Sequence, residues 1–330
     1  MAIGSGIGGQ FSIAEEVTYG TVATPARHLR LISYETIPAR DVVNVMGIAA
    51  GRLGPIDEIV TKQWGTVKVV LQAPKRGLGM LLRQIFGGTV VPVQQAATTA
   101  YKQSLIAADN RGRMLSMQGG FPNIGGTASA FTALGAKATK FSIKCAAGEV
   151  ATIEMEFFAR EISEAPGLVT WADQPQSVPF AWPQLTVGLG TFGAEAAVPD
   201  VVGFELSIER SLDIDGSFTS GNAGRMVEPN MNDWLVVTGT TDVTFGTKAN
   251  FVDRANAHTT TSMAFTFVGD VIASTFSETL KFTVPKPYFK PAGMAVPDNG
   301  VLKFSLGFDG FNDLTNGMVT CDYTSLDTAV

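Results

Sequence analysis

Short runs in which apolar and polar residues alternate are the feature that most constrains this chain. Residues 139–145 (TKFSIKC) put three apolar side chains on one face and Lys140, Ser142 and Lys144 on the other. Residues 150–157 (VATIEMEF) alternate in the same way after a glycine-containing turn. A period of two is that of a β-strand with one buried and one solvated face. The two runs therefore predict an amphipathic hairpin.

The same pattern extends over most of the chain and predicts a mainly β protein with roughly a dozen strands. Leucine and isoleucine at helical spacing in residues 78–86, followed by two glycines, predict one short helix, and residues 251–258 predict a second helical turn. Glycine and proline in residues 41–59 indicate a long loop. Residues 165–199 hold five of the sixteen prolines and indicate a connector or an outward loop. Further strands are expected at 29–37, 65–73, 204–211, 235–248, 262–269, 276–284, 301–308 and 317–323.

Two parts of the chain resemble each other and suggest an internal repeat. Residues 139–157 form one pair of alternating segments, and residues 204–248 contain a second pair. In each, the second segment includes a phenylalanine near its end. Since amphipathic hairpins share this layout in general, the repeat remains a hypothesis.

Composition limits the classes of function. Charged residues make up 16% of the chain, against about 25% in ordinary globular proteins. That low value fits either a surface covered by other subunits or a weakly charged monomer. The net charge of −6 opposes a general nucleic-acid binder, which would carry a basic face. Two cysteines, no apolar run of membrane-spanning length and no secretion signal at the N-terminus indicate a reduced, cytoplasmic protein without a membrane segment.

No motif predicts catalysis, a cofactor or a metal. The glycines of residues 4–9 match a dinucleotide-binding pattern but have no strand before them, so we interpret them as a flexible arm. Residues 213–216 (DIDG) lack the spacing of a calcium loop and indicate a turn. His28 and His258 are far in sequence from both cysteines, which opposes a zinc site. The sequence therefore indicates a non-enzymatic protein.

The N-terminal segment provides the most specific signal. Residues 7–25 (IGGQFSIAEEVTYGTVATP) closely resemble the start of bacteriophage tail tube, or major tail, proteins. The glutamate followed by T-Y-G-T is unusual outside that family, and Ser12 stands where glycine is common. The segment covers less than a tenth of the chain. The chain is thus similar to tail tube proteins of phages with long, non-contractile tails.

The resemblance implies a mainly β subunit of the tail tube type, with a β-sandwich or barrel, one short flanking α-helix, long loops and extended N- and C-terminal arms. It divides the chain into an arm (1–28), a tube domain (29–315, with 165–199 a connector or insertion) and a C-terminal segment (316–330). Members of the family form hexameric rings whose inner strands close into one barrel. The rings stack into the virion tail tube, which encloses the tape-measure protein and conducts DNA during genome ejection.

Further expectations follow from the resemblance. Tail terminator and distal tail proteins would bind the ends of the tube, assembly would occur in the host bacterial cytoplasm, and DNA would pass without specific binding. The polar faces of the predicted hairpins would line the lumen, where acidic side chains repel phosphates; this set is Lys140, Lys144, Glu154, Glu156, Glu205, Glu209 and Asp242. The alternative is a solvated outer face. The arm that joins rings would include Gly4, Gly6, Gly9, Phe11 and Tyr19.

Two other functions remain open from the sequence. The first is a distal tail or baseplate hub protein of the same fold, which would usually carry an extra domain. The second is a carbohydrate-binding β-sandwich, for which Trp171 and Trp182 are the only aromatic cluster available.

Overall fold

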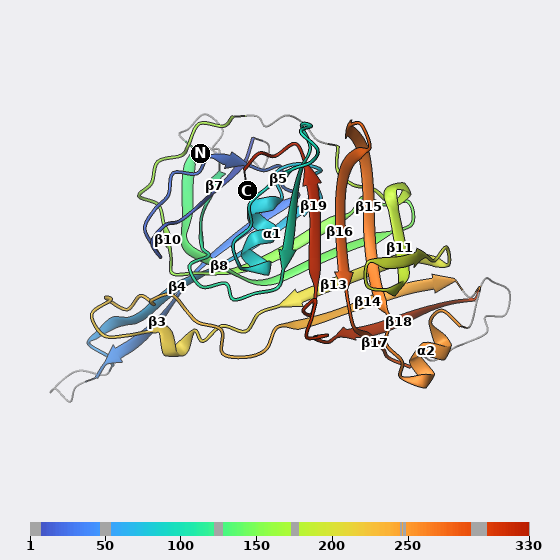
Figure 1. Ribbon diagram of the computed structural model, residues 1–330. Coiled ribbons are helices and arrows are strands. Elements are labelled where there is room, and N and C mark those ends of the chain that lie inside the picture. Colours follow the sequence, from blue (N-terminus) through green and yellow to red (C-terminus); the bar gives the residue numbers. More distant parts are fainter. Residues whose placement is uncertain are drawn as a thin grey trace.

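The computed structural model describes residues 8–46, 54–121, 128–172, 178–244, 246, 249–291 and 302–329. In these residues the chain is mainly β and forms two antiparallel sheets, one of twelve strands and one of seven (Figure 1). The two sheets pack as a sandwich with short helices at its flank. The predicted fold class is confirmed.

The larger sheet is branched at its longest strand, β8. The N-terminal half of β8 pairs with β7 and β10, and its C-terminal half pairs with β9 and β13. Its members are β1 (Gln10–Glu15), β2 (Arg27–His28), β3 (Ser33–Val45), β4 (Asp57–Gln72), β7 (Leu115–Phe121), β8 (Ser129–Ala146), β9 (Thr152–Ala159), β10 (Glu161–Ser163), β13 (Val201–Glu209), β14 (Val236–Thr244), β17 (Pro287–Phe289) and β18 (Lys303–Gly310).

The smaller sheet includes the C-terminal end of the chain. Its strands, in spatial order, are β12 (Ala194–Ala197), β11 (Leu185–Thr191), β15 (Ser262–Ala273), β16 (Phe276–Val284), β19 (Thr320–Ser325), β6 (Tyr101–Ile106) and β5 (Val93–Gln94). Since β19 pairs with both β16 and β6, the C-terminal segment lies in the middle of this sheet. The N-terminal segment is also part of the fold, because β1 pairs with β7.

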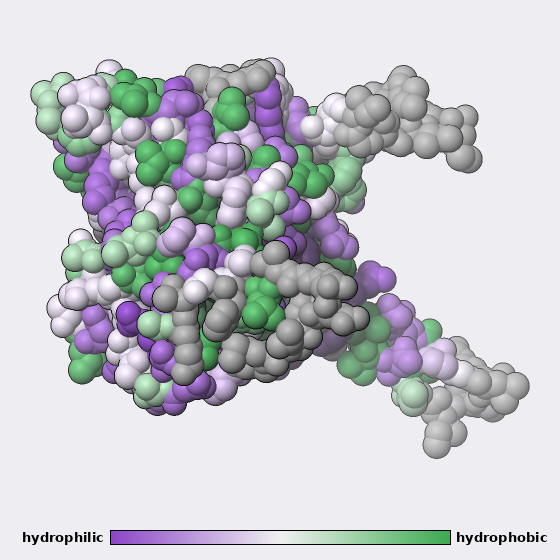
Figure 2. All heavy atoms as spheres, turned by 90° about the vertical axis from the view of Figure 1, so that its right-hand side faces the viewer, coloured by the Kyte–Doolittle hydropathy of each residue, from purple (hydrophilic) through white to green (hydrophobic). Residues whose placement is uncertain are grey.

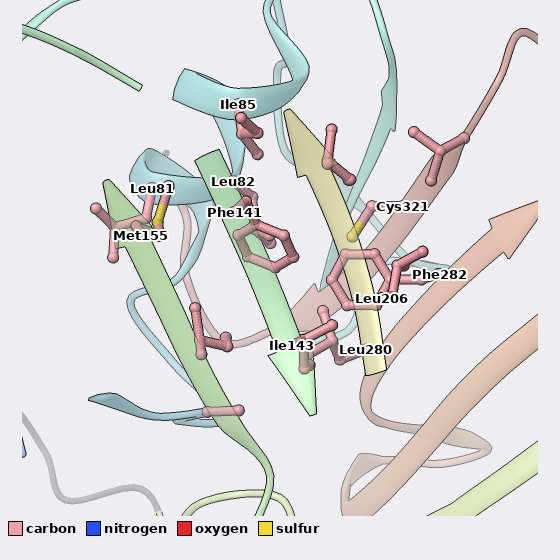
Figure 3. Close-up of a cluster of buried hydrophobic side chains, with 14 of the residues drawn as sticks. Leu81, Leu82, Ile85, Phe141, Ile143, Met155, Leu206, Leu280, Phe282 and Cys321 are labelled. Atoms are coloured by element: carbon pink, nitrogen blue, oxygen red, sulfur yellow. The ribbon is translucent and has the colours of Figure 1, made fainter. Parts of the chain in front are cut away.

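The core lies between the two sheets, and helix α1 (Gly79–Phe86) covers one side of it. Leu81, Leu82 and Ile85 of α1 point toward Phe141 and other side chains of the large sheet (Figure 3). Side chains of the smaller sheet complete the cluster; they include Leu280, Phe282 and Cys321. The helix confirms the prediction from leucine spacing. Helix α2 (Val252–Ala257) confirms the second helical turn, and the 3₁₀ turns are Trp182–Gln184 and Asp215–Ser217.

Two segments that we expected to be loops contain strands. Strand β3 continues to Val45 and β4 begins at Asp57, so strand replaces most of the loop predicted at 41–59. The β-branched residues at 42–45 and 59–61 favour strand, and this outweighs the effect of the nearby Gly54 and Pro55. In residues 165–199, prolines flank Leu185–Thr191 without interrupting it, and this stretch forms β11.

The two predicted amphipathic hairpins are present as β8–β9 and β13–β14, and β8 pairs with β13. The strand order repeats in a different way from the one we expected. The order β3–β4–β9–β8 is followed by β13–β14–β18–β17, so each first hairpin is extended by a second. The repeating unit is therefore four strands, not one hairpin.

Candidate functional site: a charged sheet face and a protruding hairpin

The outer face of the large sheet carries most of the charged side chains predicted to act together. In β8, Phe141 and Ile143 point into the core, so Lys140 and Lys144 point away from it. Strand register then brings acidic residues beside them. Lys140 lies opposite Glu156 on β9 and Glu209 on β13, and Lys144 lies opposite Glu205.

Ion pairs connect neighbouring strands across this face. Lys140 Nζ lies 2.8 Å from a carboxylate oxygen of Glu209. Lys68 of β4 lies 2.6 Å from Glu154 and 3.9 Å from Glu156. The hydrogen bond to Glu154 raises the pKa of Lys68, and the one to Glu209 raises the pKa of Lys140. Because these side chains are about a third to a half exposed, solvent screens the ion pairs and their contribution to stability is small. Their main effect is to set the charge of the face.

The structure enlarges the predicted set, and we call the whole the charged face. Lys290 of the segment after β17 lies 2.8 Å from Asp309 of β18, which shares the outward side of the sheet. Among the described residues the charged face has seven carboxylates and five lysines, a surplus of two negative charges; these are Glu35, Glu154, Glu156, Glu205, Glu209, Asp242, Asp309, Lys68, Lys140, Lys144, Lys290 and Lys303.

A two-stranded hairpin protrudes from one end of the large sheet. Strand β9 pairs only with the Gly65–Gln72 part of β4, so beyond Gly65 strands β3 and β4 have mainly each other as neighbours. We call residues 39–46 and 56–63 the hairpin arm; it projects at the lower left of Figure 1 and behind the body at the lower right of Figure 2.

The hairpin arm exposes apolar side chains on both of its faces. Val43 and Ile59 are direct register partners and are each 56% exposed. Val42 and Val60 form the next pair, on the opposite face, and are also exposed. A lone two-stranded hairpin is marginally stable in water. An arm with this composition is suited to pack against another protein surface.

The N-terminal motif is a clamp built around a buried carboxylate. Glu16 is 3% exposed and accepts hydrogen bonds from the backbone N–H of Gly20, the backbone N–H of Gly135 and the Ser116 hydroxyl, each at 2.8 Å. Burial raises the pKa of Glu16, and the three hydrogen bonds act in the opposite direction. The motif thus holds the segment after β1 against β7 and the bend of β8.

Glycines in this clamp allow close approach of large side chains. Gly135 has φ +63°, and a Cβ there would lie 2.8 Å from a carbon of the Tyr19 ring. Gly20 has φ +72°, and the Arg160 side chain occupies the position that its Cβ would need. These contacts explain the T-Y-G sequence. The Tyr19 ring packs on Gly135, and the Arg160 side chain packs on Gly20.

The residues predicted to join rings lie in different places. Phe11 is 2% exposed in the core, and Tyr19 packs within its own chain as described above. Gly9 directly precedes β1, whereas Gly4 and Gly6 lie outside the described residues. The two tryptophans of the carbohydrate-binding alternative have separate partners. The Trp171 ring packs against His28, and the backbone N–H of Trp182 donates to the backbone carbonyl of Glu149 at the β8–β9 turn.

Sequence reasoning missed the hairpin arm and part of the charged face. The valine- and isoleucine-rich stretches at 42–45 and 56–60 were a strand signal, but the glycine and proline between them dominated the interpretation. Lys68 was available from the alternation of residues 65–72. Its pairing with Glu154 depends on the β4–β9 register, which only the fold gives.

Comparison with known proteins identifies the family. A family model described as "Phage tail tube protein" matches residues 6–327, nearly the whole chain. No curated protein matches the chain. In the described part of the chain, no helix has the length and apolar character needed to span a membrane.

Proposed function

Because the chain belongs to the phage tail tube family, we propose that its copies join through their sheet edges into rings and that the rings stack into the tail tube. The protein is a structural component of the virion tail. In this proposal the tube encloses the tape-measure protein during assembly in the host cytoplasm and later conducts DNA during ejection. Tail terminator and distal tail proteins would close its two ends.

The observation that carries the proposal is the open large sheet. Within the described residues, β3 pairs only with β4 and β17 only with β18, so each end of the sheet has unpaired backbone groups. Exposed strand edges favour pairing with another chain. Pairing that closes by rotation produces a ring and removes the edges.

The charged face is the proposed wall of the lumen. Its acidic surplus would weaken contact with phosphates, and its internal ion pairs would leave few isolated charges to bind DNA tightly. The opposite face of the sheet is the core, so this is the only side of the sheet that could line a channel. A solvated outer wall is the competing arrangement.

The hairpin arm is the proposed contact between successive rings. It projects beyond the body and carries apolar side chains that its own chain leaves exposed. The residues before β1 are the second candidate for such a contact, since β1 itself is fixed in the sheet by β7.

Electron microscopy of the purified protein tests the proposal. Tubes or stacked rings are the expected result. Isolated rings that never stack, even at high concentration, would favour the distal tail or hub alternative. A compact particle that remains monomeric at every concentration, and also in the virion, would refute the proposal.

Charge reversal tests the assignment of the lumen. Changing Glu154 and Glu156 to lysine should leave tube assembly nearly intact, because both side chains are substantially exposed. Genome delivery should slow, because the wall would then attract phosphates. Two lysines at Val91 and Val93, which are exposed near the edge of the smaller sheet, provide the control. Failure of assembly before delivery would show that the two glutamates are structural. Finding them on the outer wall of the tube would end the lumen assignment.

A further inference from the structure

The connection between β13 and β14 packs against the base of the hairpin arm. This connection, residues 211–235, runs beside the β3–β4 hairpin (gold in Figure 1), and we call it the brace. The backbone N–H of Gln63 donates to the carbonyl oxygen of Gly224 at 2.8 Å. This bond lies beyond the point where β9 stops pairing with β4, at Gly65↔Ala159. The brace therefore provides the arm with a backbone partner that the sheet no longer supplies.

Side chains extend the contact between the brace and the arm. The Phe218 ring meets the Trp64 ring edge to face, with their centroids 6.1 Å apart. Lys62 Nζ lies 4.9 Å from the centre of the Phe218 ring and 3.1 Å from a carboxylate oxygen of Asp215. Lys62 and Trp64 are half-buried as a result, whereas every residue from 54 to 61 is exposed.

The brace touches the arm where β4 bends. Register shifts by one residue after Asp41, which leaves Thr61 without a register partner on β3. Such a bulge bends its strand, so it sets the direction in which the arm leaves the body. Gly224 lies directly against this point, because a Cβ there would lie 2.9 Å from the carbonyl oxygen of Thr61.

The brace is itself anchored to the body. Glu228 accepts a hydrogen bond from the backbone N–H of Gly112 at 2.7 Å and forms an ion pair with Lys137, which is fully buried in β8. Arg225 forms an ion pair with Glu161 of β10. Contacts therefore run without a break from the arm through the brace to the large sheet.

The four-strand repeat gives the arm and the brace corresponding places in the chain. The arm lies within the β3–β4 hairpin, which begins the first unit, and the brace joins β13 to β14, which begin the second. The connection in the second unit does not project as a hairpin. It folds back and supports the hairpin of the first unit.

We propose that the brace fixes the direction of the hairpin arm before another copy of the chain binds. A two-stranded hairpin alone is marginally stable and would sample many directions. Contact with the brace orders the arm in the free subunit, so less conformational entropy is lost when the arm meets a second copy. The inference rests on the proposed function, in which the arm joins copies of this chain.

Amide hydrogen exchange in the dilute, unassembled subunit tests whether the brace orders the arm. Gly224→Ala places a methyl group against Thr61, and the Gln63 N–H should then exchange about tenfold faster. Gly221→Ala is the matched control. Gly221 and Gly224 have φ values of +86° and +75°, but a Cβ on Gly221 has nothing within 4 Å, so that variant adds backbone strain without pressing on the arm.

Tube formation tests whether this order is used in assembly. Gly224→Ala should raise the critical concentration about 3- to 10-fold, although no exposed side chain of the arm has changed. Phe218→Ala introduces no backbone strain, removes the ring that contacts Lys62 and Trp64, and should act in the same direction. Phe218→Tyr keeps the ring and should behave like the wild type.

The two measurements separate the ways in which the proposal could fail. Unchanged exchange in both Gly224→Ala and Phe218→Ala would overturn the brace, and so would equal effects of the two glycine variants. Faster exchange with an unchanged critical concentration would show that assembly does not use the order of the arm, which also overturns the proposal. A wild type that forms no ring or tube would refute the proposed function, and exchange in the free subunit would still decide whether residues 211–235 order the arm.

Discussion

Substitution of the hairpin arm gives the sharpest test of the assembly surface. In the free chain, Val43 and Ile59 are each 56% exposed and face the same side of the arm. Full burial of such a side chain is worth about 1.5–3 kcal/mol, so covering the exposed part should contribute about 1–1.5 kcal/mol at each position. The Val43→Lys/Ile59→Lys variant should then lose about 2–3 kcal/mol for each contact between copies. This corresponds to an increase of about 30- to 150-fold in the critical concentration for assembly.

The assay compares tube formation with the stability of the free subunit. Critical concentration is measured by light scattering and sedimentation, and the free energy of unfolding by urea titration of the dilute chain. Unfolding should change by no more than about 0.5 kcal/mol at each site, since both side chains are already exposed. Val271→Lys, at a 67% exposed position in β15, is the matched control and should assemble normally. An unchanged critical concentration for Val43→Lys/Ile59→Lys would refute the role of this face. The Val42→Lys/Val60→Lys variant then tests the opposite face.

Three further predictions concern the fold that supports these surfaces. Arg210, which is 4% exposed, donates hydrogen bonds to the carbonyl oxygens of Ile85 and Phe86 at the end of α1. Arg210→Met should therefore lower the free energy of unfolding, measured in urea, by about 3–5 kcal/mol. A loss below about 1 kcal/mol would contradict this role. Leu82→Ala should lower the free energy of unfolding by about 2–5 kcal/mol in the same assay, because the Leu82 side chain is fully buried between the sheets. An unchanged melting temperature would show that the core can close around the cavity. Burial raises the pKa of Glu16 above its value in the unfolded chain, so its contribution to stability is present below about pH 4.5 and is lost as pH rises through the folded value. Wild type should therefore lose stability relative to Glu16→Gln as pH rises above about 4.5. A change of the opposite sign would mean that the three hydrogen bonds outweigh desolvation.

Local patterns were sufficient to predict elements whose burial repeats along the chain. The alternation in residues 139–157 predicted β8 and β9, and the leucine spacing in 78–86 predicted α1. The error at 41–59 has a physical cause. The hairpin arm projects away from the core, so neither of its faces is buried in the free chain. Its strands therefore expose valine and isoleucine on both faces and lack the period-two pattern of an amphipathic strand.

The candidate surfaces required information that no local pattern contains. The acidic residues of the charged face could be predicted from alternation, but their ion pairs depend on which strands are neighbours. Lys68 and Glu154 are far apart in sequence and meet because β4 pairs with β9. The repeat was misassigned for the same reason. Two similar hairpins, β8–β9 and β13–β14, are adjacent in space, whereas the equivalent pairs are β3–β4 with β13–β14 and β8–β9 with β17–β18.

The small acidic surplus of the charged face sets the range over which the proposed wall would act on DNA. At physiological ionic strength, electrostatic interactions decay over about 8 Å. Repulsion from the wall would therefore act only on the part of the duplex that comes within that range of it. The ion pairs formed by Lys68, Lys140 and Lys290 keep the lysines engaged, so a phosphate that touches the wall would have to compete with a carboxylate for each of them. A wall of this kind would prevent adhesion without resisting entry. Rapid passage requires both properties, so charge reversal at Glu154 and Glu156 should affect delivery most strongly at low salt.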